Sequence, residues 1–131
     1  MDLARSPQEL AREAAEQLRA LNHRTLDPKA FEQPSDVAGV VEALTILLDR
    51  LPQALGQAAV ALRSFQRHNM IRMDDGTDPT DQTHQVVGAL ENAQGLIQGA
   101  RSALRAAAPL DHMGGHWNAA DETEDEMESS R

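Results

Sequence analysis

The segment VAGVVEALTILLDRLPQALGQAAVALRSF, from Val37 to Phe65, decides the fold of this chain. Its apolar residues recur at intervals that alternate between three and four, which places them on one face of an α-helix. They are Val37, Val40, Val41, Leu44, Leu47, Leu48, Leu51, Leu55, Ala58, Leu62 and Phe65. A stripe of this length predicts a long helix whose apolar side must be covered by another helix.

The ends of this helix are marked by turn and capping residues. Ser35 is the predicted cap, the helix is expected over about residues 36–68, and Asp74-Asp75-Gly76 predicts the turn that follows. Pro52 removes one backbone hydrogen bond and clashes with the preceding turn. We therefore expect helix two to be kinked at Pro52 or split there into two helices.

A shorter helix is predicted before this segment. Ser6-Pro7-Gln8-Glu9 has the spacing of a capping box, in which a serine side chain accepts a hydrogen bond from the backbone three residues later. Asp27-Pro28 disfavours helix, because a residue before proline is pushed out of the α region. The first helix is expected over about residues 7–24.

A third helix is predicted after the turn. Asp78-Pro79-Thr80 repeats the cap-then-proline signal, and an apolar stripe from Val86 to Ala107 ends at Pro109. The third helix and the long second helix would then form a helical hairpin.

Composition supports an all-α fold. The chain has 131 residues, of which 40% are hydrophobic but only 2% aromatic, so the core must come from Ala, Leu and Val. The predicted architecture is a three- to four-helix bundle over residues 1–110, followed by a flexible acidic tail over residues 111–131. The net charge is −9, and the density of acids after Trp117 predicts a disordered segment.

The sequence offers little for catalysis. Cysteine is absent, and no catalytic triad, phosphate loop or metalloprotease motif is recognisable. The segment from Asp111 to Trp117 holds two histidines and a carboxylate, but Gly114-Gly115 disfavours the helix that would align the histidines for a metal. We expect a cytoplasmic protein that is not an enzyme, holds no metal or other cofactor and does not span a membrane.

The predicted function is protein–protein interaction, by a small adaptor, assembly or regulatory subunit. A short first helix leaves part of the hairpin uncovered near the turn, so self-association or a hetero-complex would complete the bundle. Methionine side chains adapt to irregular partners. The predicted partner-binding residues are Leu62, Phe65, Met70, Ile71 and Met73.

The alternative function is a nucleic-acid-associated regulatory accessory. Arg63, Arg67 and Arg72 form a basic cluster near the end of the second helix, where they could contact phosphates. The acidic tail would then compete with the nucleic acid for this cluster. The overall net charge of −9 opposes such binding, since the chain repels polyanions.

In size and helix content the chain is similar to small helical hairpin proteins of the WXG100 type, which actinobacterial type VII systems export. Those proteins carry Trp-x-Gly in the turn between their helices, and the turn at Asp74-Asp75-Gly76 has no tryptophan. Their secretion signal resembles Tyr-x-x-x-Asp/Glu, which Trp117 to Asp121 matches in spacing alone. The resemblance therefore extends to architecture and assigns no family.

Overall fold

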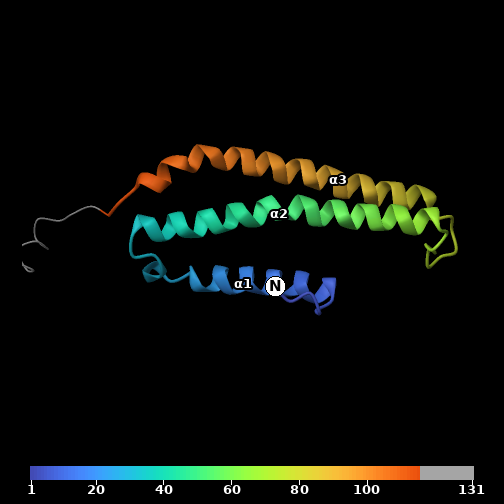
Figure 1. The fold of residues 1–131 in the computed structure, drawn as a ribbon, viewed down its shortest axis with the longest axis horizontal. Coiled ribbons are helices and arrows are strands. Elements are labelled where there is room, and N and C mark those ends of the chain that lie inside the picture. Colours follow the sequence, from blue (N-terminus) through green and yellow to red (C-terminus); the bar gives the residue numbers. More distant parts are fainter. Residues whose placement is uncertain (116–131) are drawn as a thin grey trace, which may run out of the picture. The chain divides into compact units, whose positions relative to one another are not determined.

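The protein is all-α, as predicted. Its structure, a computed structural model, describes residues 1–115, and this part of the chain contains helices and no strand (Figure 1). The elements are α1 (Pro7–Arg24), the 3₁₀-helix η1 (Pro28–Ala30), α2 (Pro34–Arg67), α3 (Thr80–Ala103) and the 3₁₀-helix η2 (Leu104–His112). None of the helices among these residues combines the length and the apolar character needed to cross a bilayer. The predicted acidic tail lies outside the described residues.

The described residues belong to two compact units. Among the described residues, the first unit contains Met1–Val37 together with Gly114 and Gly115, and the second unit is Ala38–Met113. The second unit is the helical hairpin, in which α2 and α3 lie side by side and antiparallel (Figure 1).

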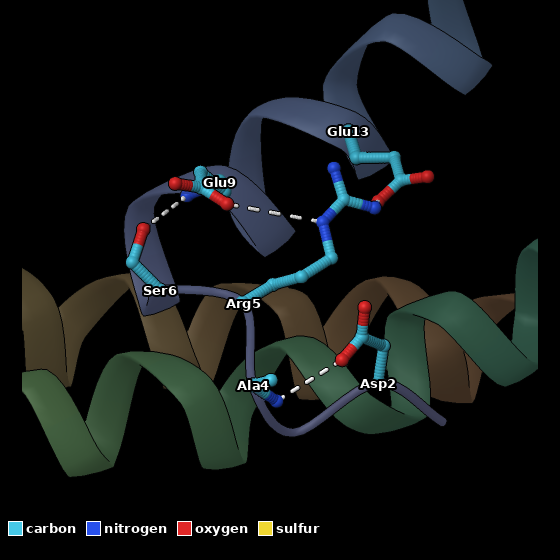
Figure 2. A network of polar contacts seen from close by, with 6 residues as sticks. All are labelled: Asp2, Ala4, Arg5, Ser6, Glu9 and Glu13. Carbon is cyan, nitrogen blue, oxygen red and sulfur yellow. Dashed lines mark hydrogen bonds and ion pairs between the residues drawn. The ribbon is translucent and has the colours of Figure 1, made fainter.

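Helix α1 begins and ends as the sequence predicts. The Ser6 hydroxyl accepts a hydrogen bond of 3.2 Å from the backbone N–H of Glu9, with Pro7 in the first turn (Figure 2). Arg5 lies beside the same turn and forms ion pairs with Glu9 and Glu13. The Ser6 hydroxyl thereby satisfies one of the backbone donors that lack partners within the helix.

Helix α2 corrects one detail of the prediction and decides between two alternatives at another. It starts at Pro34, and Ser35 is not its cap; the Asp36 carboxylate instead accepts from the backbone N–H groups of Glu32 and Gln33, each at 3.0 Å. It also runs through Pro52 without splitting. Proline removes a single backbone bond, while the buried ring of Pro52 packs inside the hairpin and its carbonyl gains a side-chain donor.

The contact between α2 and α3 includes hydrogen bonds and ion pairs between side chains. Gln94 of α3 donates from Nε2 to the Pro52 carbonyl at 2.7 Å, and Arg101 pairs with Asp49. Nearer the turn, Arg63 forms an ion pair with Glu91. The fully buried side chains within residues 1–115 are Pro52, Ala59, Thr83 and Val87. The hairpin unit by itself therefore holds almost no hydrophobic core.

The end of α2 is closed by a left-handed residue. Asn69 has φ 54°, the Met70 N–H donates to the Phe65 carbonyl at 2.8 Å, and the Asn69 N–H donates to the Gln66 carbonyl at 3.2 Å. This pair of bonds is the Schellman arrangement, which satisfies carbonyls that the helix leaves free. Gly76, with φ 77°, supplies the other left-handed position of the connecting loop.

The third helix ends earlier than predicted. The α-helical hydrogen bonds stop at Ala103, and the chain continues as η2 through Pro109 to His112. Proline disfavours the α conformation of the residue before it, and helix ends often tighten into 3₁₀ turns. The apolar stripe was therefore a correct guide to helical periodicity but overestimated the length of the α-helix.

Candidate interaction surface

The two helices of the hairpin meet along one row of residues each. On α2 this facing row is Pro52, Gly56, Ala59, Arg63 and Gln66, and on α3 it is Thr80, Thr83, Val87, Glu91 and Gln94. The members of both rows are identified by their burial, ion pairs and hydrogen bonds. Gln66 Nε2 donates to Thr80 Oγ1 at 3.1 Å, and Thr83 Oγ1 donates to Gln66 Oε1 at 3.4 Å. Beside small and polar side chains the rows hold the buried apolar residues Pro52 and Val87, and most leucines of the predicted apolar stripes lie outside the rows.

Each apolar stripe lies one residue before the facing row. Leu51, Ala58 and Phe65 directly precede Pro52, Ala59 and Gln66, and the same offset holds for Val86 before Val87. One residue corresponds to about 100° around an α-helix. Because α2 and α3 are antiparallel, a half-turn about an axis normal to the plane that contains both helices exchanges them. This rotation keeps each side of the hairpin in place, so an offset of one residue in the same direction puts both apolar stripes on the same side.

We call this side the apolar face. Its residues are Val40, Leu44, Leu47, Leu51, Leu55, Ala58, Leu62 and Phe65 of α2, with Val86, Leu90, Ala93, Ile97 and Ala100 of α3. All of them are half-buried or exposed, and none is charged. Phe65 and Val86 remain 45% and 48% exposed.

The opposite side of the hairpin, which we call the polar face, carries the residues that directly follow the facing rows. They are Gln53, Gln57, Val60, Ser64 and Arg67 of α2, with Asp81, His84, Gly88, Asn92 and Gly95 of α3. Val60, at 60% exposed, is its one large apolar side chain. Charge is therefore segregated between the two sides of the hairpin, which is a property of a surface built to be covered on one side.

The five predicted partner-binding residues form what we call the tip patch. Leu62 and Phe65 belong to the apolar face, and the Schellman bond ties the backbone of Met70 to Phe65. Met70 is 68% exposed, whereas Leu62, Ile71 and Met73 are half-buried. The structure thus brings Phe65 and Met70 together as an exposed apolar pair at the end of the hairpin.

The loop beyond the tip patch is held by two aspartates. The Asp75 carboxylate accepts from the Oγ1 and the backbone N–H of Thr77, and Asp78 accepts in the same way from Thr80. These hydrogen bonds lower the pKa of each carboxyl below its ordinary value, and the bond from the threonine hydroxyl has the larger effect. Two adjacent side-chain turns of this kind stiffen the backbone that leads into α3.

Two arginines of the predicted basic cluster lie in one groove. Arg63 and Arg67 line a groove of about 390 Å³ on the polar side of the hairpin, but Arg72 is not among its lining residues. Glu91 lies in the same groove and pairs with Arg63, which neutralises that guanidinium. The groove is therefore mixed in charge, which is a poor match for a row of phosphates.

For a metal, residues 1–115 contain no grouping of three or more His, Asp or Glu side chains of the kind that binds an ion. Of the segment from Asp111 to Trp117 that the sequence singled out, His116 and Trp117 lie outside the described residues. No family model, no curated protein and no solved structure matches this chain.

Sequence reasoning missed the contribution of α3 to the candidate surface. Val86, Leu90 and Ile97 carry a visible helical period, but that period does not show which side of the hairpin they share. Their place beside the α2 stripe follows from the antiparallel pairing and from the one-residue offset.

Proposed function

We propose that this protein is a non-enzymatic protein–protein interaction module, a small adaptor, assembly or regulatory subunit, that binds through its apolar face and tip patch. The chemistry of the apolar face carries the proposal. Interface centres are depleted in charge and rich in apolar side chains, and this face has both properties along the whole hairpin. The lack of cysteine suits a reducing compartment, so the proposed site of action is the cytoplasm.

The tip patch is the proposed anchor for the partner. Phe65 is aromatic and 45% exposed, and aromatic side chains dominate the energetics of many interfaces. Met70 beside it is flexible and polarisable, so it adapts to a partner of irregular shape. An exposed pair of this kind has no role in the contact between α2 and α3.

The test compares two aspartate substitutions on the same helix. Phe65→Asp places a charge in the tip patch, whereas Val60→Asp places the same charge on the polar face at a residue that is also exposed. The assay is binding of the full chain to proteins from its native host and to itself, measured by co-purification and by light scattering. Circular dichroism checks that both variants keep their helices.

Phe65→Asp is expected to weaken the complex by at least about 30-fold, as for an aromatic hot spot, and Val60→Asp to leave it within about threefold. A complex that tolerates Phe65→Asp as well as Val60→Asp would contradict the assignment of the tip patch. A chain that forms no complex of any kind would contradict the proposed function.

A further inference from the structure

We propose that the occupant of the apolar face is a second copy of this chain, so that two hairpins pack face to face as a four-helix assembly. This inference rests on the proposed function and names its partner. It concerns the part of the apolar face beyond the tip patch, and in particular the section around Ala58.

The apolar face has the size that a stable dimer needs. From Val40 to Phe65 the face runs about 38 Å along α2, at the standard helical rise. The α3 stripe from Val86 to Ala100 runs about 21 Å, so the face is two helices and about 18 Å wide over that length and one helix wide over the rest, a footprint of about 530 Å² on each copy. Two copies would together bury about 1,100 Å², above the area of about 1,000 Å² that a specific protein–protein interface should clear.

The length of α1 argues against an intramolecular cover. The helix has 18 residues and is about 27 Å long, so it is shorter than the apolar face. Its apolar stripe is also narrow and consists of Leu10, Ala14, Leu18 and Leu21. A second hairpin has the same length, the same width and the same lack of charge, because it is the same surface.

Charge placement is compatible with such a dimer. A two-fold dimer brings one surface patch against itself, so a patch with charges of one sign would repel its copy. The apolar face holds no charge, and the charged residues Arg67 and Asp81 belong to the polar face. Pairing through the apolar face therefore buries no unpaired ion, whereas pairing through the polar face would bury several.

The small residues of the face allow close approach. Ala58 lies between Leu55 and Leu62 on the α2 stripe and is exposed in the hairpin, as is Ala100 on α3. Small side chains between leucines let a facing helix insert its own larger side chains, as in knobs-into-holes packing.

The first experiment measures oligomeric state. Ala58→Glu is compared with Val60→Glu, which carries the same charge two residues away on the polar face; both positions are exposed, so neither substitution removes packing within the hairpin. Sedimentation equilibrium of the full chain is expected to give a dimer for the natural sequence and for Val60→Glu. Ala58→Glu is expected to raise the dimer Kd by at least about 30-fold, because each dimer would bury two unpaired carboxylates.

The second experiment distinguishes a second copy from a cover supplied by the same chain. The protein has no cysteine, so Ala58→Cys and Val60→Cys each introduce a single thiol. Their reaction rates with a soluble thiol reagent are measured across a wide range of protein concentration. Protection at residue 58 that grows with concentration, and no such change at residue 60, is the expected result.

Two outcomes would overturn the inference. Protection at residue 58 that is equal at all concentrations would mean that a segment of the same chain covers the face. A monomer whose thiol at residue 58 reacts freely throughout would mean that no copy binds there. Either result leaves the proposed function standing if Phe65→Asp still abolishes a complex with another protein, so the two failures are separable.

Discussion

Gly56 offers the sharpest test of how α2 and α3 are held together. An ideal Cβ at this position would lie 2.6 Å from Nε2 of Gln94 and 3.5 Å from its Cδ. The same Nε2 donates to the Pro52 carbonyl at 2.7 Å. Gly56→Ala must therefore push the Gln94 amide out of its place and break that hydrogen bond.

Two effects of similar size oppose each other in this variant. Alanine stabilises a helix interior by about 0.5–1 kcal/mol relative to glycine. Loss of the hydrogen bond costs about 0.5–1.5 kcal/mol. The free energy of unfolding of Gly56→Ala is thus expected to lie between about 1 kcal/mol below and about 0.5 kcal/mol above that of the natural protein, although the substitution adds a favourable helix former.

The assay is a double-mutant cycle with Gln94→Ala, measured by urea unfolding at one fixed protein concentration. Once Gln94 is gone, Gly56→Ala is expected to stabilise by about 1 kcal/mol, which gives a coupling of about 1 kcal/mol between the two sites. Gly39→Ala is the matched control in the same helix, since a Cβ there meets nothing within 4 Å. Equal effects of Gly56→Ala in both backgrounds would refute the inferred contact.

Two further predictions concern the helix cap and the loop. Ser6→Ala removes the acceptor for the Glu9 N–H and should destabilise the start of α1 by about 1 kcal/mol, seen as roughly fivefold faster hydrogen exchange at Glu9; unchanged exchange would contradict the cap. Thr77→Val should raise the pKa of Asp75 toward its ordinary value and leave that of Asp78 unchanged in an NMR titration, whereas equal shifts would contradict the local cause. Because the folded pKa is lowered, this carboxylate stabilises the fold above the ordinary aspartate pKa, and the contribution is lost as pH falls through the lowered value.

The helices themselves were largely predictable from local chemistry. Ser6 and Pro7 mark the start of α1, and Asp27-Pro28 excludes its continuation, because capping and proline effects act within a few residues. The same local reasoning left two alternatives at Pro52, a kinked helix or a split one, and the structure excludes the split. A buried ring and a donor from Gln94 are contacts over a long sequence separation, and no local pattern contains them.

The candidate surface was predictable in part. The exposure of Phe65 and Met70 agrees with their selection from the sequence, but their proximity depends on the left-handed residue Asn69 and on the bond between their backbones. The ion pair of Arg63, a member of the predicted basic cluster, was not foreseen, since Glu91 lies 28 residues from Arg63 in the chain. To predict an ion pair between two helices, one must know which residues of the helices lie opposite each other, and a single sequence does not specify this register.

The sequence alone determined that this chain forms amphipathic helices and which residues share a stripe on each of them, because helical periodicity is a property of one segment at a time. Only the tertiary structure decided where the neighbouring helix lies. The facing rows of α2 and α3 are one residue away from the apolar stripes, so small and polar side chains such as Gly56 and Gln94 share the contact with the buried Ala59 and Val87. Antiparallel pairing then leaves both stripes on one side of the hairpin, and the apolar face arises from that geometry.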